Sequence, residues 1–223
     1  MRYAIAMLLV FALAGSCFAA DIVTVPTANQ LKQGQVDVAY YYVSLNFDAP
    51  APQHVHAQTV YFGLTDRIEL DAHRYDIDGV SASTIINASV LLMSETVTIP
   101  DVVIGGRNLG GSEVGGVPGS DKRSWYVAAA KTLNLPQYGA PELPIIRLHA
   151  GLGTEDLTLF EEPRHKGLFG GVQALLTPDI GAVALHDGQD IITGLTYSPQ
   201  GSGLTIKGGK FGSHWWAGLS WAR

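Results

Sequence analysis

Two histidines separated by one residue are the first candidates for chemistry. His54 and His56 would point to the same face if their segment is a β-strand, because successive side chains of a strand alternate between faces. Two imidazoles on one face could supply two ligands to zinc or copper. Spacing identifies no third ligand among the remaining histidines, which are His73, His149, His165, His186 and His214. We therefore expect no metal site, with His54 and His56 as weak candidates only.

Hydroxyl nucleophiles are the second possibility. Ser112, Ser120 and Ser124 lie in or beside a glycine-rich segment, and no G-x-S-x-G elbow is present. Such serines are more simply explained as turn residues in contact with water. The segment "GGRNLGGSEVGGVPGS" also lacks the G-K-[ST] ending of a phosphate-binding loop, so we interpret it as an external loop. We expect no enzymatic activity, no catalytic residue and no cofactor.

The elements that carry these residues are predicted to be β-strands. In Val60–Asp76, the apolar side chains recur at every second position, and polar side chains fill most of the alternate positions. A three-residue loop at 65–67 would make Leu64 and Ile68 cross-strand partners and keep the apolar face continuous through the turn. This pattern is typical of a hairpin with one apolar face and one polar face.

Similar segments recur along the chain, separated by Gly, Pro, Asn and Asp. We predict about twelve antiparallel strands, with ten as the alternative. Their expected ranges are Gln35–Leu45, His54–Leu64, Ile68–Tyr75, Ala82–Leu92, Pro100–Arg107, Ser124–Thr132, Pro144–Gly153, Gly167–Leu176, Ile180–Leu185, Ile191–Tyr197, Leu204–Lys210 and His214–Arg223.

The N-terminus predicts export. Met1–Ala20 has an early Arg2, an apolar stretch and the ending "SCFAA", which fits a signal peptide cleaved after Ala19 or Ala20. Cys17 is the only cysteine, and acylation at a lipoprotein-like site is the alternative. The mature chain, 21–223, is expected to form one β domain.

Composition narrows the class of protein further. Charged residues make up 15% of the chain and the net charge is -6, so no basic tract suggests nucleic acid. No apolar run after Ala20 reaches the roughly 20 residues of a membrane helix. Two alternatives follow: an outer-membrane barrel, or a soluble periplasmic β-barrel that binds an apolar ligand inside.

The two faces of the strands favour the membrane alternative. The longer connections alternate with shorter ones, as in outer-membrane barrels that have short periplasmic turns. The candidates for the lipid face and its aromatic girdle are Val60, Phe62, Leu64, Ile68, Leu70, Trp215, Leu219 and Trp221. The candidates for the lumen are Glu69, Asp71, His73, Arg107, Lys131, Arg147 and Lys207.

Three segments carry a family resemblance: "VTVPTANQLKQGQVDVAYYYV", "YFGLTDRIEL" and "GLFGGVQALLTPDIGAVALHDGQDIITGLTYSPQGSGLTIKGG". They resemble the small YjbH-type outer-membrane β-barrels of bacteria, which are associated with exopolysaccharide systems. Leu185 and His186 stand where members often have an acidic and then an aromatic residue, so no role of that acidic side chain carries over. The resemblance implies location and architecture, and no catalytic residues.

The sequence therefore predicts a closed, up-and-down transmembrane β-barrel in the bacterial outer membrane, with a structural, binding or porin-like transport role. The resemblance adds a link to exopolysaccharide export or assembly. The expected partners are outer-membrane lipid, including lipopolysaccharide, and a polysaccharide or an envelope export complex, but no nucleic acid. The alternatives are the soluble ligand-binding barrel and, less favoured, an enzyme that modifies lipid or polysaccharide.

Overall fold

The computed structural model describes residues 21–22, 25–45, 53–114, 120–135, 144–154, 158–159 and 162–223. The expected signal peptide, Cys17 and parts of the long connections lie outside these residues. Among the described residues, no helix is long and apolar enough to cross a membrane. Two small hairpins lie outside the main sheet: β1 (Asp21–Ile22) with β2 (Val25–Pro26), and β10 (Thr158–Leu159) with β11 (Glu162–Pro163).

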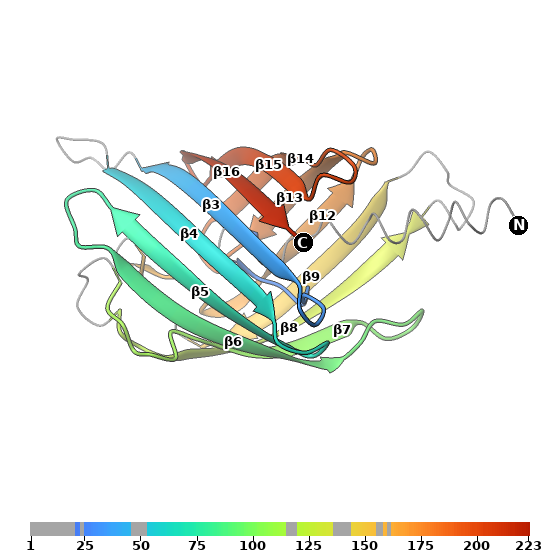
Figure 1. Cartoon of the computed structure of the whole chain (residues 1–223), viewed down its shortest axis with the longest axis horizontal. Helices are drawn as coiled ribbons and strands as arrows, with labels where there is room; N and C mark the ends of the chain where they lie inside the picture. The colour runs from blue at the N-terminus through green and yellow to red at the C-terminus, as the bar shows by residue number, and fades with distance from the viewer. Residues whose placement is uncertain are drawn as a thin grey trace, which may run out of the picture.

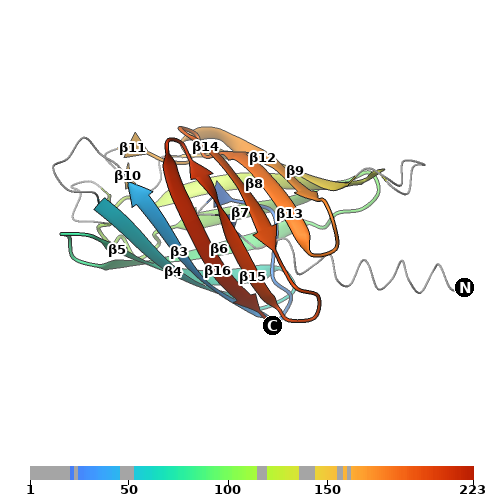
Figure 2. The same cartoon turned by 90° about the horizontal axis from the view of Figure 1, so that it is seen from above.

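The other twelve strands form one closed barrel (Figures 1 and 2). Each pairs with its neighbours in an antiparallel manner, and the pairing of β9 with β12 and of β16 with β3 completes the circle. The strands are β3 (Val36–Leu45), β4 (Gln53–Gly63), β5 (Ile68–Ile77), β6 (Ser83–Met93), β7 (Asp101–Arg107), β8 (Ser124–Asn134), β9 (Ile145–Gly153), β12 (Gly167–Leu175), β13 (Ile180–His186), β14 (Ile191–Tyr197), β15 (Leu204–Phe211) and β16 (His214–Ala222).

The prediction of a closed barrel with twelve strands is confirmed. Every expected strand is present, and its ends lie within two residues of the expected ends, as at the longer β5 and β8. The β4–β5 turn also forms as expected: the amide of Leu64 donates to the carbonyl of Ile68 at 2.9 Å. The Thr65 hydroxyl accepts the amides of Arg67 and Ile68, which fixes the turn.

Burial resolves which face of the sheet is outside. Apolar side chains such as Val60 and Leu148 are 46% and 44% exposed, whereas the alternate positions are buried. The outward face is therefore largely apolar, the reverse of a soluble barrel with an apolar interior and a charged surface. The inward face is mixed, because large apolar side chains such as Tyr75, Phe169 and Trp216 are buried there beside the charged ones.

The barrel has two ends, which we name by the chain. The proximal end is the one where β3 begins and β16 ends, and it holds the connections after β4, β6, β8, β12 and β14. The distal end holds the connections after β3, β5, β7, β9, β13 and β15. Closure leaves no unpaired strand edge in the wall.

Candidate functional site

The described segment before β3 folds back into the proximal end of the barrel. We call residues 25–35 the strap; in both views this blue segment lies between the walls (Figures 1 and 2). Its Val25 and Ala28 are each 1% exposed, although neither belongs to a barrel strand. The wall makes room for it at Gly63, where an added Cβ would lie 2.0 Å from the carbonyl oxygen of Lys32. The missing side chain of Gly63 is therefore what admits the strap.

Polar contacts attach the strap to the inward faces of β5 and β6. The side-chain amide of Gln30 lies 2.5 Å from the Ser89 hydroxyl on β6. The backbone amide of Leu31 donates to a carboxylate oxygen of Glu69 on β5 at 2.8 Å. These bonds give partners to polar groups of the strap that are partly shielded from water. Glu69, one of the expected lumen residues, therefore binds the chain's own backbone.

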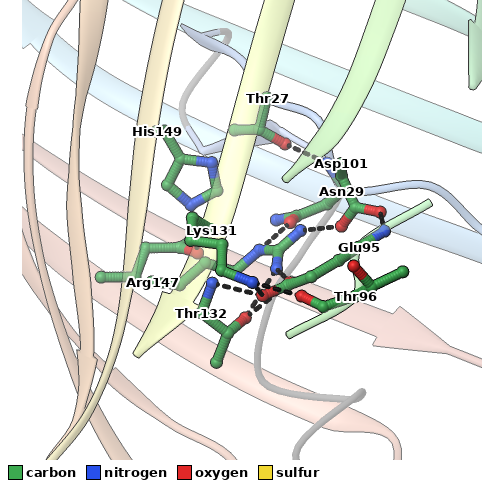
Figure 3. Close-up of polar contacts among 10 residues, drawn as sticks. Thr27, Asn29, Glu95, Thr96, Asp101, Lys131, Thr132, Arg147 and His149 are labelled. Carbon is green, nitrogen blue, oxygen red and sulfur yellow. Dashed lines mark hydrogen bonds and ion pairs between the residues drawn. The ribbon is translucent and has the colours of Figure 1, made fainter. Parts of the chain in front are cut away.

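Arg147 on β9 is the centre of the proximal polar cluster (Figure 3). Its Nε donates to Oδ1 of Asn29 in the strap at 2.7 Å. Its Nη1 donates to Glu95 and to the Thr132 hydroxyl, both at 2.7 Å, and its Nη2 donates to Asp101 at 2.6 Å. Guanidinium donors in a fixed planar arrangement suit such multiple recognition. One side chain thus joins the strap, the β6–β7 turn and three strands.

Glu95 brings the β6–β7 turn into this cluster. Its carboxylate accepts the amide and the hydroxyl of Thr132 at 2.7 and 3.0 Å. Partial burial alone would raise the pKa of Glu95, but the hydrogen bonds from Thr132, Lys131 and Arg147 outweigh burial and lower that pKa below 4.5. Glu95 is therefore a stable carboxylate at neutral pH, paired with Arg147.

Lys131 is placed differently from the expectation. It lies on the same face of β8 as the exposed Trp125 and Val127, so it does not point into the lumen from mid-strand. Its ammonium group bends to the proximal rim, where it lies 3.2 Å from Glu95 and donates to the carbonyl of Thr96. The assignment of Lys131 to the lumen is corrected: Lys131 shares the alternation of the outward Trp125 and Val127, and its ammonium group turns to the rim.

A second cluster lies on the inward face of β5. Asp71, His73 and Tyr75 follow one another at alternate positions, with Oδ1 of Asp71 2.7 Å from Nε2 of His73 and the Tyr75 hydroxyl 3.2 Å from Nδ1. Asn87 on β6 donates to Asp71 from the other side. His73 is 0% exposed, so this chain of polar groups is packed into the interior rather than open to a solute.

The remaining expected lumen residues also lie buried. Arg107 on β7 is buried near enough to Asp71 for the two charges to interact. Lys207 on β15 donates to the Tyr41 hydroxyl at 3.2 Å and lies over the Tyr41 ring. Charged side chains therefore enter the interior from several strands, and each lies beside a carboxylate or an aromatic ring.

Sequence reasoning missed a third cluster, at the distal end. Arg164, which precedes β12, donates from one nitrogen to Asp187 at 3.1 Å and to Asp190 at 2.6 Å, and its guanidinium lies over Phe211. Oδ1 of Asp187 also accepts the amides of Gln189 and Asp190, which closes the β13–β14 turn. The "HDGQD" stretch was visible as a turn, but nothing in it indicated an arginine from another connection.

The other candidate residues have structural roles. The two imidazoles of His54 and His56 lie on the outward face of β4, with Nδ1 atoms 2.8 and 2.5 Å from the hydroxyls of Tyr42 and Tyr40. The Ser120 hydroxyl accepts the amide of Val114 and donates to its carbonyl, which ties the β7–β8 connection together. Both arrangements hold neighbouring segments in place.

No protein-family model matches the chain, and no curated protein sequence matches it. Among solved structures, the chain is similar to a KdgM porin in complex with disordered oligogalacturonate, with 11% identity and a TM-score of 0.51. It is similar to another KdgM porin structure with 12% identity and a TM-score of 0.50; in both cases 84% of this chain and 98% of that chain are covered.

An outer-membrane channel from Pseudomonas putida F1 has a TM-score of 0.43 and 12% identity, with 86% of this chain and 96% of that chain covered. At such identities, the two KdgM likenesses show the fold alone. The chain shares the overall barrel fold of these porins, and the resemblance to YjbH-type barrels stays a prediction.

Proposed function

We propose that this chain is an outer-membrane barrel of porin-like architecture, in which a strap made of its own N-terminal residues closes one mouth. The observation that carries the proposal is the difference in polarity between the two faces of the wall. Large apolar side chains are exposed on the outward face, and buried charges collect on the inward face. In water such an exposed face would be unfavourable, whereas in lipid it is the face that a barrel needs.

The lengths of the strands and the closure of the barrel also support a membrane environment. Eight of the twelve barrel strands have 9 to 11 residues, which is the length that a tilted strand needs to cross a bilayer, and the other four have 7 or 8. A closed ladder satisfies the backbone groups that lipid cannot. By analogy with outer-membrane barrels, the proximal end faces the periplasm and the distal end faces outward.

The closed state follows from what occupies the interior. Ile85, Tyr75, His73 and Ile192 are each at most 1% exposed, so side chains fill the barrel at several levels. The strap adds a barrier at the proximal mouth. We propose that solute passes only after the strap leaves its site on Arg147, Glu69 and Ser89.

The charges of the interior bear on the solute. Each inward cation in the described part of the chain lies beside a carboxylate: Arg107 near Asp71, Lys207 near Asp37, Arg147 at Asp101 and Glu95, and Arg164 at Asp187. Paired cations do not form a free basic track for an acidic chain. We therefore propose a neutral polar solute, such as a segment of neutral polysaccharide, in keeping with the exopolysaccharide link that the family resemblance implies.

Extraction and conductance test this proposal. Membranes from cells expressing the full chain are washed with carbonate, and the detergent-purified protein is compared on a gel before and after boiling. We expect resistance to extraction, a shift in mobility on boiling, and very low conductance in planar bilayers. Release by carbonate without a shift would instead favour the soluble barrel with an internal apolar ligand.

A further inference from the structure

Among the described residues, the outward wall has a polar interruption on β4 and β5 that the proposed function does not use. Near the distal end, β8, β9 and β12 carry apolar outward residues, namely Trp125, Leu152 and Leu168. On β4 and β5, the outward positions at the corresponding end are polar instead. We call these the polar patch, formed by His54, His56, Gln58, Arg74 and Asp76.

Arg74 is the cation of this patch, and it is exposed on the outward face of β5. Its position is three residues before the end of the strand at Ile77, which is about 10 Å along the strand. No described residue provides an ion-pair partner for it. An unpaired guanidinium on the lipid face is costly away from the interface, so an anion beside it would be favourable.

An apolar groove begins where the polar patch ends. It has a volume of about 370 Å³ and lies across β15, β16, β3 and β4, with Val38, Tyr40, Val60, Leu219 and Trp221 in its lining. Gln58 belongs to both features: it lines the groove, and it is the direct cross-strand partner of Arg74. A chain lying in the groove would therefore have its head beside Arg74.

The rings around this junction are held in place. The Tyr40 hydroxyl lies 2.5 Å from His56, and Tyr42 stacks on His54 with ring centroids 5.3 Å apart. Asp76 is the cross-strand partner of His56, so a carboxylate stands on the distal side of the patch. Because of that charge, the favourable position for an anion is on the proximal side, between Arg74 and the groove.

We propose that this junction binds one anionic membrane lipid. An acyl chain lies in the groove, and the lipid phosphate accepts hydrogen bonds from the guanidinium of Arg74. This inference rests on the proposed function, because it places the outward face in a membrane. It assigns a specific lipid site to one sector of the wall.

Native mass spectrometry of the mature protein in a nonionic detergent tests the site. The protein is titrated with dioleoyl phosphatidylglycerol and, in parallel, with dioleoylglycerol, which has the same chains and no phosphate. We expect one phosphatidylglycerol to bind with preference over dioleoylglycerol. Arg74→Gln should weaken that binding roughly tenfold or more, because a charge-assisted contact is lost.

Two further variants separate the parts of the site. Val60→Trp fills the groove and should weaken the binding of both lipids, whereas Arg67→Gln removes an exposed arginine of the β4–β5 turn and should change neither. Equal binding of the two lipids, or unchanged phosphatidylglycerol binding in Arg74→Gln, would overturn the inference. A protein that is extracted by carbonate would contradict the proposed function itself, so the two failures are distinguishable.

Discussion

Nε of Arg147 lies 2.7 Å from Oδ1 of Asn29, a residue 118 positions earlier in the chain. This bond connects the strap to the opposite part of the wall, and the same guanidinium also holds Glu95 and Asp101. The strap is therefore held at the proximal end by this charged junction as well as by its bonds to β5 and β6. Changes at this junction should alter the strap before they alter the barrel.

The first prediction concerns the loss of the arginine. Arg147→Leu removes the charge that balances Glu95 and Asp101 in a largely buried site, and breaking such a pair on one side costs about 3 kcal/mol or more. We expect a lower urea midpoint for unfolding in detergent micelles, followed by tryptophan fluorescence. Arg67→Gln, at an exposed turn position, is the control and should leave the midpoint unchanged.

The second prediction uses the backbone contact at Gly63. Gly63→Ala would place a Cβ 2.0 Å from the carbonyl oxygen of Lys32, and backbone at that distance must move. We expect the strap to leave its site while the barrel stays folded. A cysteine at Ala28, introduced with Cys17→Ser, should react slowly with a maleimide in the parent and rapidly in the Gly63→Ala variant.

Gly208→Ala is the matched control, because its added Cβ would meet its nearest neighbour at 3.4 Å, an ordinary contact. Labelling at position 28 should stay slow in that variant. In planar bilayers, Gly63→Ala should also raise conductance above that of the parent. Unchanged labelling in Gly63→Ala would mean that the strap does not depend on the missing side chain, and unchanged conductance would contradict its role as the barrier.

Much of the barrel could be predicted from the sequence because its wall obeys a period of two residues. Positions such as Phe62 and Leu70 are exposed, while Tyr61 and Glu69, which directly precede them, are buried. Turn residues such as Thr65 marked where the strands reverse. The alternation alone could not indicate which face of the sheet lies inside the barrel. The burial of the charged face in the structure shows that this face is the inner one.

The clusters at the two mouths could not be predicted, because they depend on pairs that are far apart in the sequence. Arg147 and Glu95 lie on different elements, and Arg164 meets Asp187 only because a distal connection folds back onto the β13–β14 turn. Lys131 was assigned to the wrong face for a different reason: it shares the alternation of Trp125 and Val127, which are exposed on the outward face. Local alternation predicts the direction of a side chain at mid-strand, whereas at a rim a long side chain bends toward its partner.

The third prediction concerns pH. The pKa of Glu95 in the folded protein is lowered below 4.5, so its pairing contributes stability above that value, and the contribution is lost as the pH falls through the folded pKa. We expect the urea midpoint to fall between neutral pH and about pH 3 in the parent. Glu95→Gln should have a lower midpoint at neutral pH and a shallower dependence on pH. Parallel pH profiles for the two proteins would contradict this account.

The fourth prediction separates burial from distance at the distal cluster. Asp190 is closer to Arg164 than Asp187 is, at 2.6 against 3.1 Å, but its side chain is 36% exposed, whereas that of Asp187 is 1% exposed. A charge pair screened by water contributes little, and a buried one is costly to break. We therefore expect Asp187→Asn to lower the free energy of unfolding by roughly 2 kcal/mol and Asp190→Asn by less than about 1 kcal/mol.

Both substitutions keep a side-chain oxygen in place, so the capping of the turn by Oδ1 of residue 187 is preserved in each variant. Urea unfolding of the two variants side by side in the same detergent gives the comparison, and an equal or larger loss in Asp190→Asn would show that distance rather than burial controls this cluster.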